Sequence, residues 1–415
     1  MKRLLVLIAL FVAVFGKKTF EDQVFRITPK DEAQIDLLKE LTEEGEYLGL
    51  SVWMEPILES LPLDLHVPFH SLQAVRAFLA YNQIPYHIMI ENVQELLDDE
   101  QRDMVKYRGL ARSTDDFVYT TYHDLNSINS FMDMLVAENR NMVSKVVIGQ
   151  SYEKRPLNVL KFSTGANRPG IWIDTGIHSR EWVTQASGVW FAKKIVKDYG
   201  RDPVLTDILN SHDIFLEIVT NPDGFVYTHT KDRMWRKTRK PNPGSSCVGV
   251  DPNRNWDAGF GGDMCFSHCS YFFWEGYYIA LIVANRAGVS PFTIANLLLS
   301  IIQFRCFFFY CFSFLISPIS LSSSHFHPVL KAITSLQSLY NTRYTYGSII
   351  TTIYQASGGT IDWTYNQGIK YSYTFELRDT GRYGFILPAN QIVPTAEETW
   401  LALMAIMEHT KNNPY

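Results

Sequence analysis

Two apolar stretches decide the fold class of this chain: IWIDTGI at residues 171–177 and IFLEIVT at residues 214–220. Each has the length and composition of a strand that is buried on both faces. The second stretch ends in a turn, Asn221-Pro222-Asp223-Gly224, and YSYTFEL at residues 371–377 predicts a third strand. With helical patterns between them, these strands predict an α/β domain from about Asp116 onward, with a mixed, largely buried sheet flanked by helices.

The region before this domain follows a different order. Residues 17 to about 108 predict, by their periodicity, strands at 24–27, 48–53, 63–67 and 86–90 and helices at 31–41 and 71–81. That strand-helix-strand-strand-helix-strand order is typical of a small α+β open sandwich. At the other end of the chain, Thr395 and Glu398 predict a capping box that opens the last helix.

Composition and the first residues of the chain indicate where the protein is located and which partners it binds. The 38 basic and 43 acidic residues form no basic block, so nothing indicates nucleic acid as a partner. Five cysteines leave room for one or two disulfides. Lys2 and Arg3 precede an apolar run over residues 4–15 that is too short to span a bilayer and ends at Gly16. We therefore expect a secretory signal in residues 1–16 and a secreted, extracellular protein, the alternative being a buried N-terminal element.

Residues 271–327 break the pattern. Their only charged residues are Glu275, Arg286 and Arg305, and we expect neither a strand nor a helix there. Ile294–Ile316 has the hydropathy of a membrane span, although Arg305 lies near its middle. Phe, Leu, Ser and Pro, which dominate the later part, are encoded by pyrimidine-rich triplets of the kind that precede a splice acceptor. We therefore interpret the segment as translated intron or a gene-model error in preference to a membrane helix.

Four groups of residues have the chemistry of a site. His178 and Glu181 stand three apart at the end of a strand, and imidazole and carboxylate both suit zinc. Arginines and asparagines at 235–239 and 251–256 could clasp a carboxylate, although a solvated basic turn explains residues 237–239 as well.

The other two groups lie near the C-terminus. Tyr354 opens a glycine-rich loop and could close over a ligand or simply pack. Glu376 lies in an apolar strand, where a carboxylate is costly unless it is functional or paired, for example with Arg378 or Arg382.

Together these motifs resemble the pancreatic metallocarboxypeptidase A family. The matching stretches are GIHSREW (176–182), DPNRNW (251–256), IYQASG (353–358) and FELRDTG (375–381). The resemblance runs from the signal to about Ser270 and resumes near Leu330. It implies a secreted zinc metallocarboxypeptidase precursor, with one zinc per chain, that cleaves the C-terminal peptide bond of peptides and proteins.

The resemblance also implies roles for individual residues. His178 and Glu181 match zinc ligands, and Glu376 matches the general base that activates the zinc-bound water. The remaining matches are Arg236 for oxyanion stabilisation, Arg180, Asn253, Arg254 and Tyr354 for the substrate's terminal carboxylate, and Ile361 for specificity. An apolar residue at position 361 is similar to the A type, which removes aliphatic and aromatic C-terminal residues.

In this interpretation residues 17–112 are an activation segment and residues 113–415 the catalytic domain, with 271–327 as an aberrant apolar segment. A trypsin-like protease would cut the basic connector after Arg108 or Arg112. We expect a monomer with no membrane attachment.

One part of the family pattern is missing. The family's third zinc ligand is a histidine in a His-Ser-Tyr-Ser-Gln stretch, and Arg305 occupies the position that corresponds by length. His268, His325 and His327 are poorly placed to replace it. We also expect the strand that carries this ligand to be absent, which would leave a hole in the sheet.

The family's disulfide implies that Cys247 pairs with Cys269, or alternatively with Cys265. Because the third zinc ligand is missing, we expect this chain to be impaired as an enzyme. A non-catalytic binder of peptide C-termini and a form anchored in a membrane through residues 294–316 remain as alternatives.

Overall fold

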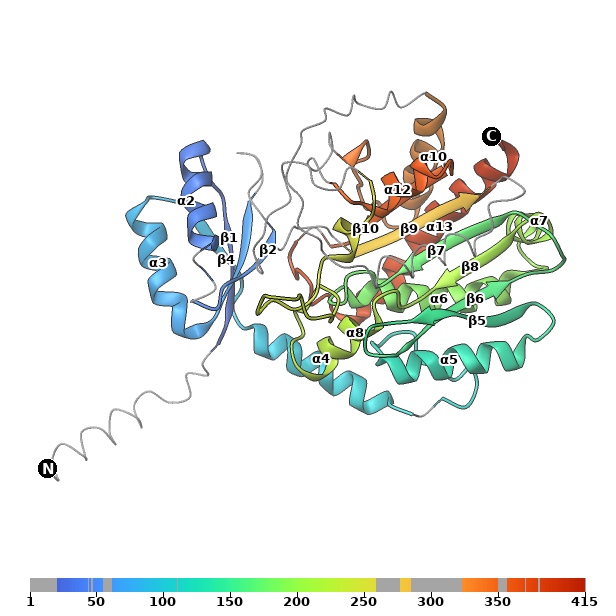
Figure 1. The fold of residues 1–415 in the computed structure, drawn as a ribbon, viewed down its shortest axis with the longest axis horizontal. Coiled ribbons are helices and arrows are strands. Elements are labelled where there is room, and N and C mark those ends of the chain that lie inside the picture. The colour runs from blue at the N-terminus through green and yellow to red at the C-terminus, as the bar shows by residue number, and fades with distance from the viewer. Residues whose placement is uncertain are drawn as a thin grey trace, which may run out of the picture. The chain divides into compact units, whose positions relative to one another are not determined.

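The computed structural model of the chain describes residues 21–43, 45, 48–54, 62–109, 111–258, 277–284, 323–349, 357–369, 371–379 and 381–414, with the backbone alone described at 277–284 and 323–327. The chain divides into two compact units (Figure 1). The first comprises the residues up to Asp99 together with Arg382–Ile386, and the second comprises most of the chain from Glu100 onward.

The first unit has the predicted element order. In sequence its elements are β1 (Gln23–Ile27), α2 (Glu32–Glu43), β2 (Ser51–Met54), β3 (Leu63–Val67), η2 (Phe69–Ser71), α3 (Leu72–Tyr81) and β4 (Tyr86–Ile90), followed by α4 (Val93–Tyr107). The strands form an antiparallel sheet in the order β2-β3-β1-β4. The prediction of a small α+β open sandwich is therefore confirmed.

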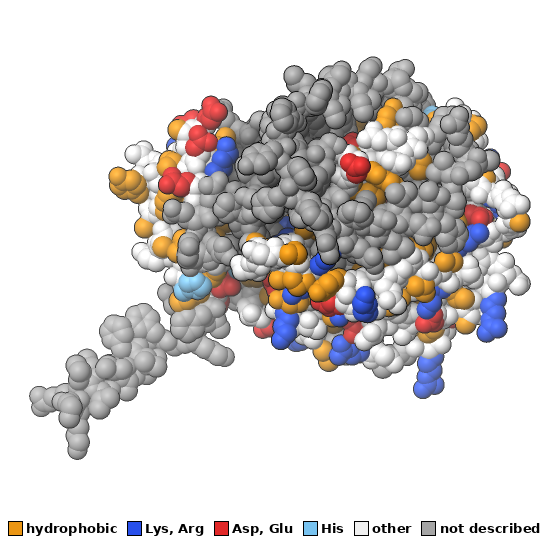
Figure 2. Space-filling model, viewed as in Figure 1, with side chains coloured by type: hydrophobic (Ala, Val, Ile, Leu, Met, Phe, Trp, Pro, Cys, Tyr) orange, Lys and Arg blue, Asp and Glu red, His pale blue; other side chains and the backbone are white. Residues whose placement is uncertain are grey.

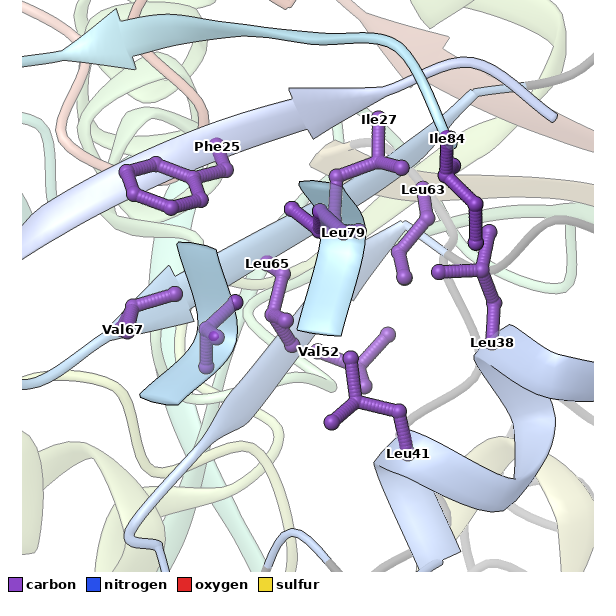
Figure 3. Close-up of a cluster of buried hydrophobic side chains, with 11 residues drawn as sticks. Phe25, Ile27, Leu38, Leu41, Val52, Leu63, Leu65, Val67, Leu79 and Ile84 are labelled. Atoms are coloured by element: carbon purple, nitrogen blue, oxygen red, sulfur yellow. The ribbon is translucent and has the colours of Figure 1, made fainter. Parts of the chain in front are cut away.

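This unit is held together by a core of its own (Figure 3). Phe25 and Ile27 alternate along β1 and face Leu65 and neighbouring residues of β3, while Leu79 of α3 packs against them. Period-two spacing on the strands and helical spacing on α2 and α3 bring the apolar side chains to one layer between sheet and helices. Burial of these side chains is the main source of stability for such a layer.

The second unit contains a six-stranded mixed sheet. Its elements are α5 (Leu125–Glu138), β5 (Val143–Gln150), β6 (Pro156–Phe162), β7 (Gly170–Thr175), α6 (Trp182–Asp198), α7 (Pro203–Ser211), β8 (Asp213–Glu217), α8 (Pro222–Thr230), η3 (Pro252–Arg254), β9 (Tyr277–Ala284), α10 (Ser323–Tyr340), α12 (Thr360–Asn366), β10 (Tyr371–Leu377), η4 (Ala389–Gln391) and α13 (Ile392–Asn412). The strand order is β10-β9-β7-β8-β6-β5, with β7 and β8 parallel and the other neighbours antiparallel. The predicted mixed, largely buried sheet is confirmed, since every residue of β7 and β8 is buried.

The two faces of this sheet are covered differently. Helix α6 packs closely on one face, because a Cβ atom added to Gly188 would lie 2.8 Å from Oγ1 of Thr175. On the other face, Trp172 and Phe215 pack with Trp256 and neighbouring apolar residues. Trp172 and Thr175 point to opposite faces because side chains alternate along a strand. Trp256, the last residue of the motif at residues 251–256, therefore lies on the Trp172 face.

The expectation of a hole in the sheet was wrong, as was the expectation of no regular structure in residues 271–327. Strand β9 lies between β7 and β10 and pairs antiparallel with both, and α10 begins at Ser323. The run YYIALIVA in β9 is uniformly apolar and rich in aromatic and β-branched residues, as a strand buried on both faces requires. Strand periodicity of two is absent from such a segment, which is why alternation did not indicate it.

The predicted capping box of the last helix was also wrong. Helix α13 begins at Ile392, three residues before Thr395. The hydroxyl of Thr395 donates to the carbonyl of Gln391 within the helix, and Glu398 accepts a bidentate pair of hydrogen bonds from Arg378. A buried carboxylate paired with a guanidinium therefore explains Glu398 better than capping does.

Among the described residues, no helix is long and apolar enough to cross a membrane. The candidate span Ile294–Ile316 lies outside them. On the face seen in Figure 2, Lys and Arg side chains are scattered along the lower edge of the view with Asp and Glu side chains between them.

Candidate active site

The turn that follows β7 carries the two candidate metal ligands. The strand ends at Thr175, two residues earlier than predicted, because Gly176 adopts a φ of +71° that only glycine tolerates easily. A side chain there would collide with Gln185, at 2.7 Å. Helix α6 then begins directly after Glu181, and both His178 and Glu181 are completely buried.

His178 lies between two carboxylates. Its Nδ1 is 2.8 Å from Oε1 of Glu181, and its Nε2 is 3.2 Å from Oδ1 of Asp251. Burial opposes the charged form, as does Arg236, but the two carboxylates raise the pKa of His178 above its ordinary value. A histidine whose outer nitrogen faces a carboxylate is typical of zinc sites, where that contact orients the ring and strengthens the ligand.

Arg236 completes the buried cluster. Its Nε and Nη2 each lie 2.9 Å from Oδ2 of Asp251, and its Nη1 lies 3.5 Å from Oε1 of Glu181. Burial disfavours the charged carboxylate, but Arg236 and His178 hold the pKa of Asp251 well below its usual range. The backbone carbonyl of Arg236 also accepts from the N–H of Ser179, which fastens the two loops together.

Arg180 is also fully buried beside this cluster. Burial and the neighbouring Arg236 lower its pKa to about 9, so its guanidinium remains charged at neutral pH. Its backbone carbonyl accepts from Nη1 of Arg233, whose guanidinium stacks 3.7 Å from the ring centroid of Trp182.

Two motifs far apart in the sequence meet at Asn253. The side-chain oxygen of Asn253 accepts hydrogen bonds from the backbone N–H and the hydroxyl of Thr360, both at 3.0 Å. Gly358 adopts a φ of +69°, and a Cβ atom there would lie 2.3 Å from the carbonyl oxygen of Arg254. The loop before α12 therefore packs against Asn253 and Arg254, which brings Ile361, the second residue of α12, near them in the chain fold.

The strand register places Glu376 at the end of the sheet where the turn with His178 and Glu181 begins. Ile279 of β9 pairs with both Thr175 and Phe375, so Glu376 is level with the residue that follows β7. Two strand spacings separate β10 from β7 by roughly 10 Å. Register-paired residues share a face, and Ala280 of β9 pairs with both Thr374 and Asp174. The alternation of side chains then puts Glu376 on the same face as Trp172 and Asp174.

The ion pair offered as an alternative explanation of Glu376 involves another carboxylate. Arg378 forms its hydrogen-bonded pair with Glu398 of α13 at 2.5 Å. Arg382, the other candidate, stacks on the ring of Tyr383.

Some site residues of the sequence prediction fall outside the described residues, namely Tyr354, Cys265, Cys269, His268 and Arg305. Cys247 is disulfide-bonded. Within the described part of the chain, no group of three or more His, Cys, Asp and Glu side chains is arranged to hold a metal ion. His178 and Glu181 fit a zinc ion in donor type and in the convergence of Nδ1 and Oε1, and they supply two protein donors.

Sequence reasoning missed the part that Asp251 plays. This residue was quoted within a motif but received no role, although it contacts both His178 and Arg236. It also accepts from the N–H of Asn253 and so begins η3. The signal available in the sequence was a carboxylate directly before Pro252-Asn253, a residue type that commonly caps a helical turn.

We compared the chain with known protein families to identify the class that this fold and buried cluster define. The model of the zinc carboxypeptidase family matches residues 128–273 and 324–402, and that of the carboxypeptidase activation peptide matches residues 25–100. The chain therefore belongs to the zinc carboxypeptidase family.

The relatives narrow the type. The chain is 55% identical to carboxypeptidase A1 of Mus musculus and of Homo sapiens, in each case over the whole of both chains. Among solved structures it resembles thrombin-activatable fibrinolysis inhibitor, with a TM-score of 0.76 and 32% identity over 95% of this chain and 100% of that one. It is thus a carboxypeptidase A-type zinc metallocarboxypeptidase precursor, whose activation peptide implies activation by a protease.

Proposed function

We propose that His178 and Glu181 are two of the three ligands of a site for one zinc ion per chain, and that this site, when complete, removes apolar residues from the C-termini of peptides and proteins. The observation that carries this proposal is the buried cluster of His178, Glu181, Asp251 and Arg236, in which both candidate ligands are completely buried and oriented by charged neighbours. Ionisable groups rarely occupy such positions without a metal or a partner.

Substrate binding would use the cations and amides around the cluster. Arg254, with Asn253, Arg180 and Tyr354, would hold the terminal carboxylate through charge-assisted hydrogen bonds. When bound, zinc supplies a Lewis acid that polarises the scissile carbonyl and acidifies the attacking water.

The residues of the chain would then move the protons and balance the charge. The carboxylate of Glu376 takes a proton from the water as its oxygen attacks the carbonyl carbon. The guanidinium of Arg236 donates to the oxygen on which negative charge develops. Glu376 passes the proton to the departing amine as the C–N bond breaks, which leaves two shorter products.

Ile361 supports a preference for apolar C-terminal residues, because an aliphatic, half-buried side chain offers no counter-charge for Lys, Arg or Asp. Turnover of peptides that differ only in a terminal Phe, Leu, Lys or Asp tests this preference. We expect Phe and Leu to be cleaved fastest, and faster cleavage of the Lys peptide would contradict it.

We further propose that the third zinc ligand is missing from this chain and that residues 271–327 are an aberrant segment that replaces the family's own sequence. In the described part of the chain, no three His, Cys, Asp or Glu side chains are grouped to hold a metal ion, and the family match is interrupted between residues 273 and 324. Arg305, at the corresponding position by length, is a permanent cation and cannot bind a metal. His325 and His327 lie in the first turns of α10. Sequencing the transcript across codons 270 to 330 tests the interpretation, and a transcript that retains these codons would contradict it.

We also propose a secreted, monomeric precursor with a signal in residues 1–16 and an activation segment in residues 17–112. Arg108 and Arg112 support cleavage by a trypsin-like protease, since both are exposed just beyond the end of α4 at Tyr107. Limited digestion followed by N-terminal sequencing should yield a first cut after one of them. A first cut elsewhere would contradict this boundary.

A non-catalytic binder of peptide C-termini remains the second candidate. Its support is that the described residues contain no group of three or more metal-binding side chains. It predicts binding of peptides through Arg254 without turnover. Binding and turnover measured on the same preparation distinguish the two functions.

A further inference from the structure

A pocket in the larger unit is lined by residues adjacent in sequence to those of the candidate active site. Ile177 precedes His178, and Val250 and Pro252 flank Asp251. The pocket encloses about 590 Å³, open solvent at its mouth included. Among its described lining residues, none is proposed for catalysis or substrate binding, so we give this pocket no part in the proposed reaction.

A rigidly held arginine lines this pocket. The guanidinium carbon of Arg239 lies 3.6 Å from the ring centroid of Tyr227 and 4.3 Å from that of Trp235. These cation–π contacts position the guanidinium and leave the N–H groups at its edge to meet a ligand.

The edge of this guanidinium lacks an acceptor. Nε of Arg239 is buried and has no hydrogen-bond partner in the described part of the chain. Its ion pair with Oε1 of Glu153 spans 4.0 Å, which is longer than a hydrogen bond. The side chain of Arg239 is nevertheless 15% exposed, so an acceptor supplied by a ligand can meet the outer N–H groups of the guanidinium.

The charge balance of the pocket favours an anion. Asp223, the one carboxylate among the described lining residues, already accepts from the hydroxyl of Ser151 at 2.6 Å, the N–H of Glu153 at 2.8 Å and Nη1 of Arg155 at 2.6 Å. Lys240 adds a second cation to the lining beside Arg239. The carboxylate is thus neutralised by its own partners, and the net charge offered to a ligand is positive.

The remaining walls are largely apolar. Ile177, Val250, Pro252 and the buried ring of Trp256 line the pocket, and Tyr152 forms a more exposed part of the lining. Such walls suit a small hydrocarbon body, because its burial removes apolar surface from water. The pocket therefore combines one fixed cationic anchor with an apolar wall, a common design of small-molecule sites.

We propose that this pocket binds a small aliphatic or aromatic carboxylate, whose oxygens accept from Arg239 and whose body packs on Trp256 and Pro252. The site is separate from the proposed carboxylate clamp at Arg254 and does not depend on zinc or on catalytic activity.

Calorimetric titration of the full chain with phenylacetate tests the proposal. Because phenylacetate also suits the clamp at Arg254, the titrations use an Arg254→Gln background, in which the pocket should still bind. Adding Arg239→Gln should weaken this binding by about 10- to 100-fold, since a hydrogen bond to a charged group contributes about 1.5–3 kcal/mol. Arg201→Gln, at an exposed arginine, is the matched control and should leave the affinity unchanged.

A second variant separates loss of the site from misfolding. Tyr152→Ala removes a wall side chain that is 46% exposed, so the fold should persist while phenylacetate binding weakens severalfold. Thermal unfolding of each variant checks the fold. Loss of all binding in Arg254→Gln alone, an unchanged affinity in the Arg239→Gln double variant, or equal binding of the uncharged phenylacetamide would each overturn the proposal.

Discussion

At the scale of single residues, Asp251 contacts both His178, a proposed zinc ligand, and Arg236, the proposed donor to the oxyanion. Its Oδ1 faces Nε2 of His178 and its Oδ2 pairs with Arg236. Replacement by Asn keeps the size but removes the charge that both neighbours require. We expect Asp251→Asn to weaken zinc binding about 10- to 100-fold, the usual effect of losing such a contact behind a ligand.

Competition with a chelator measures this effect, with Asp257→Asn as control because Asp257 is an exposed carboxylate of the same loop. Equal zinc affinity in the two variants would show that Asp251 does not orient His178.

The second prediction for a single residue concerns Glu376, which we propose as the general base of the reaction. If its carboxylate accepts the proton of the attacking water, Glu376→Gln should lower turnover by about 10²–10⁴ while zinc content and substrate affinity stay nearly constant. The experiment uses the processed enzyme made from a corrected transcript, in which the family's own sequence replaces residues 271–327. Steady-state kinetics together with metal analysis decide the outcome, and turnover above about a tenth of the wild-type value would refute the role of Glu376.

At the scale of elements, the pairing of β7 with β8 carries an unusual pair of acids. Asp174 and Glu217 are register partners on these parallel strands, and both are almost fully buried. Oδ2 of Asp174 accepts from the indole N–H of Trp172, whereas Oδ1 of Asp174 and Oε1 of Glu217 have no partner among the described residues. Burial raises the pKa of Asp174 to about 7, and burial together with Asp174 raises that of Glu217 well above its usual value.

These raised pKa values predict how stability depends on pH. The folded state binds protons more tightly than the unfolded state, whose carboxyl groups titrate near pH 4. The contribution of the pair is thus fully present below about pH 4 and is lost as the pH rises through 7. The combined variant Asp174→Asn, Glu217→Gln should unfold with a flatter pH profile.

Denaturant unfolding between pH 5 and 8.5 measures this difference. At the alkaline end the variant should exceed the wild type by at least about 1.4 kcal/mol, the equivalent of one pKa unit. The single variant Asp257→Asn serves as control, and parallel profiles for all three proteins would exclude the effect.

At the scale of the whole molecule, the number of metal ligands decides whether this chain works. A catalytic zinc normally has three protein ligands, and we propose only two in this chain, His178 and Glu181. Expressed unchanged, the chain should be inactive and should lose its zinc on dialysis, whereas the corrected form, in which the family's own sequence replaces residues 271–327, should retain one zinc per chain. Metal analysis of both proteins, purified side by side, checks this expectation. One tightly held zinc with peptidase activity in the unchanged chain would mean that another residue completes the site.

The sequence by itself determined the elements of the smaller unit, the buried strands of the larger one and the family. Strands such as Leu63–Val67, Tyr86–Ile90 and Tyr371–Leu377 were predicted to the residue. Their alternation or apolar runs are bounded by turn-forming residues, so local chemistry alone specifies them. The pair His178 and Glu181 was equally visible, since both residues stand in one short turn.

Tertiary structure decided what local pattern could not express. Tyr277–Ala284 became a strand because the sheet offered it two partners, β7 and β10. Asp251 acquired its importance only when folding brought it against His178, 73 residues away. Likewise Glu398, which was expected in a capping box, instead forms an ion pair with Arg378. Ion pairs and central strands depend on partners distant in the chain, and no local spacing records those partners.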